Sequence, residues 1–572
     1  MDFIEKKKSY EIWFLTFGIS LVMLGVFLIW NEGYLISKLL PNNSVVYKDI
    51  SREYKKYVFS LQITGIFFLY LFFNELFKNK YAKKKYDENH NLTKLITNLV
   101  VFTTFILLIA SNISDANFWL DESGQIWISR GLNHFSPGGS PFGTLRDVWA
   151  NNNKYNLDPG GFTLALYLWQ KISAIPAHLR LLPFIFFVLT YFVVYVIVKT
   201  EEIDSNLAKL FPFLLLGSPL ISHYVFELRA YSFEMLVSAL SLLITIKKKE
   251  IISSAWLSSL AGICLSVGLT SRYSAIFPVL VTSFLIFIEG VKFKKITFYR
   301  NLFLYMWPIF LVIIIIYIFV LKHQNVNMQP PDYVANSLIS NVGFLNIFLS
   351  AKAMVVWLPI VFLTWFCVRK ACAPALRDYL TYSYLLLFLL VLVSALGLYP
   401  LRFYNRFDIG IHFTLWMSWI FLGILFVSRV LKPYDINKAK LVYFILIVLV
   451  LGAFSTHRKT DAIYDSYVEC VDLNSNIKAL ANEGAIPTIR YLFELGPLKS
   501  LSKTNYDSVI FYSENRRIES NAVKISKDAA FDYDIVIFSF FDREHPIYKA
   551  VLENSNYLRC GPLSSTEFYV RR

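Results

Sequence analysis

The sequence predicts an all-α polytopic membrane bundle of about thirteen transmembrane helices, followed by a small C-terminal extracytoplasmic α/β domain. Of its 572 residues, 56% are hydrophobic and only 17% are charged. A soluble domain is roughly 45–50% apolar. The apolar residues also form long continuous runs, as helices require, because each helix satisfies its own backbone hydrogen bonds in lipid. Strands of a membrane barrel would instead alternate polar and apolar residues.

The net charge of +15 is best explained by membrane topology. In a soluble protein it would suggest binding to nucleic acid. Here the Lys and Arg residues gather between the apolar runs, and such clusters mark cytoplasmic loops. We therefore expect the lipid bilayer, and no nucleic acid, as the large-scale partner.

The apolar runs give thirteen candidate spans, several of them shorter than the ideal length of about 20 residues. In chain order they are Ile12–Trp30, Val58–Phe73, Leu95–Ala110, Leu181–Val198, Leu210–Val225, Phe233–Ile246, Ile251–Leu269, Ser274–Ile288, Leu302–Leu321, Ala353–Val368, Leu380–Leu398, Ile409–Val427 and Leu441–Phe454. The apolar stretch Phe162–Lys171 is too short to span, so we expect a helix at the membrane surface.

The basic loops also predict orientation. With Lys6, Lys7 and Lys8 in the cytoplasm, the even-numbered turns carry most of the remaining basic residues. The long loop 111–180 and the tail 457–572 then lie outside the cytoplasm. This divides the chain into two N-terminal helices and a basic loop (1–94), a membrane module (95–456) and a soluble α/β domain (457–572).

The tail contains short apolar runs of buried-strand type and one helical stretch. They are, in order, Ser508–Tyr512, Ile535–Phe538, the helix Ile547–Glu553, and Phe568–Val570. Cys470 and Cys560 both lie in this region. An extracytoplasmic setting permits a disulfide between them, although the sequence does not supply the geometry that a disulfide needs.

The loop 111–180 is long for a connection in a membrane bundle, and long loops tend to be functional. It opens with Asp121 and Glu122, directly after large apolar residues. A carboxylate in such surroundings can act as a general base. The alternative is an exposed acidic turn or helix N-terminus, which the dipeptide alone favours.

Other turns on the same face place Arg next to Tyr. The four arginines are Arg229, Arg272, Arg402 and Arg406. Arginine binds phosphate with a bidentate fork and stays charged, and ionisable groups near the bilayer are often functional. Any single Arg–Tyr pair is better explained as an interfacial anchor. Four arginines facing an acidic pair favour a phosphate site.

These motifs, taken in order, resemble the C-type membrane glycosyltransferases, within them the protein O-mannosyltransferase and lipid A aminoarabinose transferase group. The resemblance covers about Leu95 to Phe454. The motifs that carry it are Leu120-Asp121-Glu122, Asp158-Pro159-Gly160-Gly161-Phe162, Leu179-Arg180-Leu181-Leu182 and Glu227-x-Arg229-x-Tyr231. One departure is that the family often has a His-Pro-Pro turn where this chain has Asp158-Pro159-Gly160.

The resemblance implies transfer of a sugar, with inversion, from a polyprenyl-phosphate-linked donor to a glycan, lipid or protein acceptor. Asp121 or Glu122 would be the base, and the four arginines would hold the donor phosphate. We expect Glu227, Tyr231, Tyr273 and Asp158 to contact substrate. No metal or other cofactor is expected. The implied location is a bacterial-type inner membrane with an extracytoplasmic active site.

Two other functions would also use many spans and a few charges near the bilayer. A transporter or lipid-linked-glycan flippase tends to show internal repeats and mid-membrane charges. The sequence has no evident repeat, and its candidate polar residues concentrate at one face. An outer-face polymer ligase would likewise use lipid-linked sugars.

Overall fold

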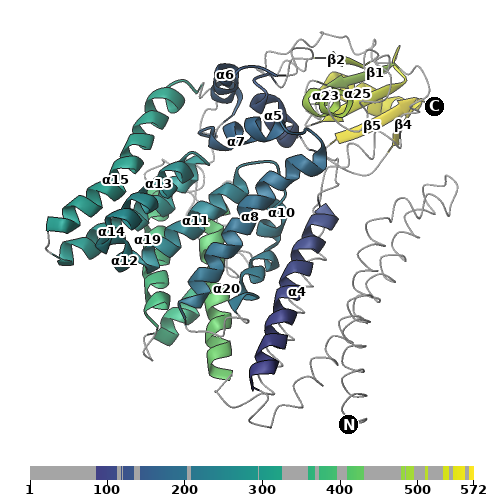
Figure 1. The fold of residues 1–572 in the computed structure, drawn as a ribbon. Helices are drawn as coiled ribbons and strands as arrows, with labels where there is room; N and C mark the ends of the chain where they lie inside the picture. The colour runs from purple at the N-terminus through teal and green to yellow at the C-terminus, as the bar shows by residue number, and fades with distance from the viewer. Residues whose placement is uncertain are drawn as a thin grey trace, which may run out of the picture.

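The protein, seen in a computed structural model, contains a large helical part and a small sheet (Figure 1). The structure describes residues 86–112, 118, 120–133, 142–156, 158–201, 208–293, 296–324, 359–367, 373–395, 409–430, 470, 478–482, 485–494, 509–512, 532–539, 545–560 and 566–571. The predicted spans Ile12–Trp30, Val58–Phe73 and Leu441–Phe454 lie outside these residues.

Among the described residues, the helical part runs from α4 to α20. Its elements are α4 (Tyr86–Asn112), α5 (Leu120–Ser129), α6 (Leu145–Tyr155), α7 (Gly161–Gln170), α8 (Pro176–Lys199), η1 (Phe211–Gly217), α10 (Pro219–Tyr224), α11 (Tyr231–Ile246), α12 (Lys248–Ser253), α13 (Ala255–Leu269), η2 (Tyr273–Ala275), α14 (Ile276–Phe293), α15 (Ile296–Ile316), η3 (Tyr317–Leu321), α19 (Pro374–Ala395) and α20 (Ile409–Val430). Of these, η1 and η2 are 3₁₀ helices and η3 is a π-helix.

Within the described residues, four helices are long and apolar enough to cross a membrane. They are Pro176–Lys199, Tyr273–Lys292, Thr297–Leu321 and Pro374–Val393. Four shorter apolar helices accompany them: Thr97–Ile109, Tyr231–Ile246, Ala255–Leu269 and Ile409–Leu425. This composition fits an integral membrane protein, while the total of thirteen spans stays a prediction.

Two predicted spans are not single helices, and the prediction of continuous helices is wrong there. Over Leu210–Val225 the chain forms η1 and then the short α10, with prolines at or near the start of each. Proline lacks a backbone N–H and sterically opposes a continuous helix. Ile251–Leu269 is interrupted at Ser254, whose backbone is extended and whose hydroxyl accepts from Leu257 N to cap α13.

Helix α11 lies at the centre of the bundle and packs against α8, α13, α14, α19 and α20 (Figure 1). Most of its side chains are buried, including those of Tyr231 and Glu234 near its N-terminus. Helices α13 and α15 also approach closely, because Gly262 lets the backbone of Tyr305 lie against it. The bundle thus buries the N-terminal turn of α11 among several helix ends.

The small sheet has the strand order β2-β1-β3-β5-β4. Its strands are β1 (Ala479–Asn482), β2 (Val509–Tyr512), β3 (Ile535–Ser539), β4 (Tyr557–Cys560) and β5 (Thr566–Arg571), with helices α23 (Ile486–Glu494) and α25 (Pro546–Glu553). Strand β1 pairs in parallel with β2 and β3, whereas β5 runs antiparallel to β3 and β4. Thus β2, β3, α25 and β5 confirm the predicted elements, and Cys470 forms a disulfide with Cys560.

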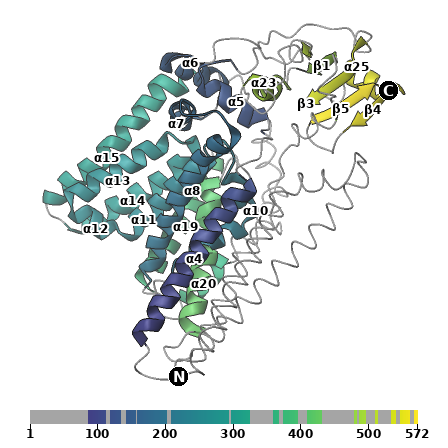
Figure 2. The same cartoon turned by 45° about the vertical axis from the view of Figure 1, so that its right-hand side comes forward.

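Helix α23 joins the sheet to α5 (Figures 1 and 2). The Trp127 indole donates a hydrogen bond to Pro487 O at 2.9 Å, and the buried Arg490 guanidinium lies 4.3 Å from the centre of the Trp127 ring. Thr488 donates to the Ser123 hydroxyl at 3.2 Å. Because α5 carries the acidic pair in its first turn, this contact fixes the helix on which those carboxylates stand.

Candidate active site

Asp121 and Glu122 begin α5 and face different surroundings, because successive helical residues point about 100° apart. The Glu122 side chain is fully buried, whereas 28% of the Asp121 side chain is exposed. Glu122 Oε1 accepts hydrogen bonds from Arg180 NH1 at 2.9 Å and from Leu228 N at 2.8 Å. The two adjacent acids therefore have different environments and different partners.

The Glu122–Arg180 pair joins three elements in the interior. Arg180, on α8, is also fully buried. It donates to Phe226 O at 3.1 Å and lies 4.3 Å from the centre of the Phe118 ring. A buried ion pair of this kind fixes geometry, because either charge alone would be left without compensation in a low-dielectric interior.

Asp121 contacts Arg229, which comes from the turn before α11. Arg229 NH1 lies 3.7 Å from Asp121 Oδ2 and also donates to Asp121 O at 3.5 Å. On its other side, Arg229 NH2 lies 3.8 Å from Asp158 Oδ2. The two carboxylate contacts are ionic but longer than ordinary hydrogen bonds. One guanidinium thus lies between two carboxylates.

The series of charges continues from Asp158 into the bundle. Arg272 Nε donates to Asp158 Oδ1 at 3.2 Å, and Arg272 NH1 lies 3.5 Å from Glu234 Oε2. Glu234 Oε1 accepts from Gly410 N at 3.2 Å. We name the series Asp121–Arg229–Asp158–Arg272–Glu234 the charged chain. It alternates acid and base from a partly exposed end at Asp121 to a buried end at Glu234.

A tight turn positions Asp158 at the middle of the charged chain. Its carbonyl accepts from Asn152 Nδ2 at 3.0 Å and from Gln324 Nε2 at 3.3 Å. Gly160 has a φ of 100°, which L side chains rarely adopt, and Gly161 N donates to Thr270 O at 2.9 Å. The two glycines therefore let the Asp158 turn press against the end of α13.

The Arg229 guanidinium keeps its charge despite its burial. Burial by itself lowers the pKa of Arg229, but the nearby Asp121, Tyr231 and Asp158 outweigh this effect and raise the pKa. Its Nε is buried and has no hydrogen-bond acceptor among the described residues. Arg229 is thus a permanent cation beside a partly exposed carboxylate, with donor capacity that its protein partners do not use fully.

The remaining predicted ligands divide into three groups. Tyr231 lies under Arg272, whose guanidinium carbon is 4.5 Å from the ring centre, and the Tyr273 hydroxyl donates to Gln324 Oε1 at 2.7 Å. Glu227 is buried, with Oε2 3.5 Å from His223 Nε2. Arg402 and Arg406 lie outside the described residues.

Two members of this neighbourhood are absent from the sequence-based prediction. Glu234 is an ionisable residue inside the predicted span Phe233–Ile246, a position that usually marks function. The position of an ionisable residue within an apolar span is thus the sequence signal that identifies Glu234 as a candidate. Gln324, which binds both the Tyr273 hydroxyl and the Asp158 carbonyl, follows a predicted span and carries no such signal.

No protein-family model and no curated protein matches the sequence. Among solved structures, ArnT from Cupriavidus metallidurans bound to undecaprenyl phosphate matches with a TM-score of 0.46 and 10% identity, over 84% of this chain and 97% of that one.

A second match is the archaeal oligosaccharyltransferase AglB from Archaeoglobus fulgidus, in complex with an inhibitory peptide and a dolichol-phosphate. Its TM-score is 0.41 at 10% identity, over 86% of this chain and 74% of that one.

The buried pair predicts a specific pattern of stability. Arg180→Met leaves the Glu122 carboxylate uncompensated in the interior, and Glu122→Leu does the same to Arg180, so each change should destabilise the protein by about 3–5 kcal/mol. The double variant removes both charges and should cost less than the sum of the two single changes. Thermal unfolding of the purified protein in detergent measures all three. Additive losses would mean that the two groups do not interact.

Proposed function

We propose that this chain is a membrane glycosyltransferase that moves a sugar from a polyprenyl-phosphate-linked donor to a glycan, lipid or protein acceptor. The observation that carries the proposal is the partly exposed Asp121 carboxylate, which lies 3.7 Å from a permanent cation, Arg229. A proton acceptor beside an anion-binding group is what transfer from a phosphate-linked sugar needs. The order of motifs along the chain supports the same reaction class.

In the proposed reaction, Asp121 is the general base. It takes the proton of the acceptor hydroxyl as that oxygen attacks the anomeric carbon of the sugar. The bond from the anomeric carbon to the phosphate oxygen breaks, and the phosphate keeps the electron pair. Attack from the face opposite the leaving phosphate inverts the anomeric configuration. Glu122 is a positioning residue in this scheme, because its carboxylate already binds Arg180 and Leu228 N.

The phosphate takes up negative charge as it leaves, and we assign its stabilisation to Arg229 and Arg272. Both are held in place by the Asp158 carboxylate between them. Arg402 and Arg406 belong to the same predicted set. Groups oriented before the reaction stabilise developing charge without reorganising, so this chemistry needs neither a metal nor another cofactor.

The predicted substrate ligands keep supporting roles in this proposal. Tyr231 supports Arg272 through its ring, and Tyr273 reaches Asp158 through Gln324. Asp158 orients both arginines, and Glu227 lies in the turn that precedes Arg229. The sugar therefore meets a site whose charged groups are oriented by protein contacts.

The setting of the reaction is part of the proposal. About thirteen spans hold the module 95–456 in a bacterial-type inner membrane, and the loop 111–180 places Asp121 on the extracytoplasmic face. The C-terminal domain, 457–572, lies on the same face and supports α5 through α23. The two N-terminal helices, 1–94, precede the catalytic module.

Asp121→Asn should reduce sugar transfer by about 10²–10⁴-fold, because it keeps the size of the side chain and removes the proton acceptor. Donor binding and the amount of folded protein should stay near wild type. Purified protein is assayed with radiolabelled polyprenyl-phosphate sugars and a membrane extract that supplies acceptors. Glu553→Gln, which changes an exposed acid at the end of α25, is the control and should remain active. Near-normal turnover with Asn at position 121 would remove the proposed base.

Arg229→Ala should raise the donor Kd by about 10–150-fold, which corresponds to one lost charged hydrogen bond of roughly 1.5–3 kcal/mol. Arg229→Lys should recover only part of this loss, because an ammonium cannot form the bidentate fork. Arg300→Lys, near the start of α15, is the control for the replacement of an arginine by lysine elsewhere in the protein, and it should leave the donor Kd unchanged. Equilibrium binding of a fluorescent polyprenyl phosphate gives the Kd. Full donor affinity in Arg229→Lys and Arg229→Ala would contradict the phosphate site and favour a transporter.

A further inference from the structure

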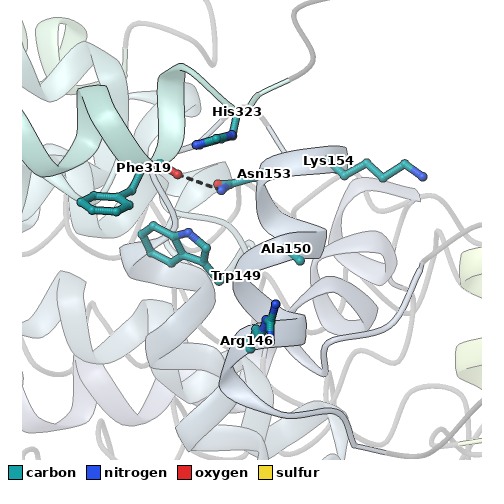
Figure 3. A pocket seen from close by; sticks show the side chains of 7 residues that line it. All are labelled: Arg146, Trp149, Ala150, Asn153, Lys154, Phe319 and His323. Carbon is teal, nitrogen blue, oxygen red and sulfur yellow. Dashed lines mark hydrogen bonds between the residues drawn. The ribbon is translucent and has the colours of Figure 1, made fainter.

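A second site lies outside the charged chain, between α6 and the end of α15. It is a pocket of about 500 Å³ (Figure 3). Its lining comes from one face of α6 and from η3 and the residues after it: Arg146, Trp149, Ala150, Asn153, Lys154, Phe319 and His323. The Asn153 amide donates to Phe319 O at 3.0 Å and so joins the two walls.

The ionisable groups that line this pocket are all basic: Arg146, Lys154 and His323. Arg146 and His323 form no ion pair with any carboxylate in the part of the chain that the structure describes. The acidic neighbour on α6, Asp147, accepts from the backbone and hydroxyl of Thr144 at 2.7 Å each and thus caps the helix, and it also interacts electrostatically with Arg146. The pocket therefore favours an anionic ligand, and its guanidinium suits a phosphate.

The pocket adjoins the part of the bundle that is best suited to contact lipid. Of the four candidate membrane spans, the one that ends at Leu321 is the least buried inside the protein. Large apolar side chains along it are exposed, including Trp307, Phe310, Ile314 and Phe319, the last of which also lines the pocket. A lipid whose acyl chains lie along α15 would have its headgroup at the pocket, since apolar chains avoid water.

The pocket is also connected to the candidate active site. Gln324 directly follows His323, and its Nε2 donates to Asn156 O at 3.1 Å and to Asp158 O at 3.3 Å. Asn152, one residue before the pocket residue Asn153, also donates to Asp158 O. Both walls of the pocket thus continue into the hydrogen bonds that hold Asp158.

We propose that this pocket binds the phosphate of a bilayer lipid headgroup, with Arg146 and His323 as its main ligands and Trp149 against the adjoining apolar part. The site is distinct from the donor-phosphate site at Arg229 and Arg272. Through its connection to Asp158, the bound lipid supports the donor-phosphate site, because Asp158 orients Arg229 and Arg272. That role rests on the proposed transferase function, whereas the binding itself does not.

Lipid binding is measured on the full-length protein in neutral detergent by native mass spectrometry, with titrations of palmitoyl-oleoyl phosphatidylglycerol and of the matching phosphatidylcholine. We expect Arg146→Gln and His323→Gln together to raise the phosphatidylglycerol Kd by about 10-fold or more. Lys322→Gln is the control, because it removes a neighbouring exposed charge that does not line the pocket. This change should alter the phosphatidylglycerol Kd less than about twofold. The proposed site would be wrong if Lys322→Gln weakened phosphatidylglycerol binding as much as the double variant does, or if the double variant kept full affinity.

Two further arms separate the possible sources of phosphate and the two proposals. Inorganic phosphate at millimolar concentration should leave phosphatidylglycerol bound, and its displacement would show a site for free phosphate and overturn the lipid assignment. Asp121→Asn should keep the lipid Kd unchanged, which supports a separate binding site. If Arg146→Gln weakens lipid binding but leaves sugar transfer unchanged, the role of the lipid at the donor site is wrong, and the binding site stands.

Discussion

The Asp158 carboxylate, shared by Arg229 and Arg272, is the contact on which the rest of the site depends. These arginines come from the turns before α11 and after α13, and their like charges would repel without the carboxylate between them. Asp158 is itself held by Asn152 and Gln324, so α6 and the end of α15 orient it. One carboxylate thus brings together segments far apart in the sequence at a single point beside the membrane helices.

A second constraint keeps Asp121 at the exposed end of that arrangement. Glu122 is anchored to α8 and to the turn before α11, and α23 holds the opposite side of α5. Because the helix is fixed at both contacts, Asp121 has little freedom to approach or leave Arg229. The small sheet therefore supports the site through α23 without supplying a reacting group. The buried Glu122 holds α5 in place, and Asp121 on the same helix is the proposed base.

The sequence was sufficient for the features that composition and short motifs determine. Apolar runs located α8, α11, α14, α15 and α20, and β-branched runs located β2 and β3. The helix breaks at Pro219 and Ser254 are not predicted by the apolar runs. The hydrophobicity of a whole run does not report where one residue interrupts the backbone hydrogen bonds of a helix. Strand β1, Ala-Leu-Ala-Asn, lacks the residues that favour strands and depends on its two parallel neighbours. Likewise, Asp121 is partly exposed and Glu122 is buried because of tertiary contacts that the dipeptide alone does not specify.

The central claim is that a lipid-linked phosphate binds to Arg229 and Arg272 in the charged chain. A polyprenyl phosphate with a photoreactive diazirine on its first isoprene unit tests this directly, because mass spectrometry of the labelled protein identifies the residues beside the phosphate. The account predicts labels within the turns 226–231 and 270–273, which competing unlabelled polyprenyl phosphate should remove. Labels confined to α6 and the end of α15, or spread evenly over the lipid-facing helices, would contradict it.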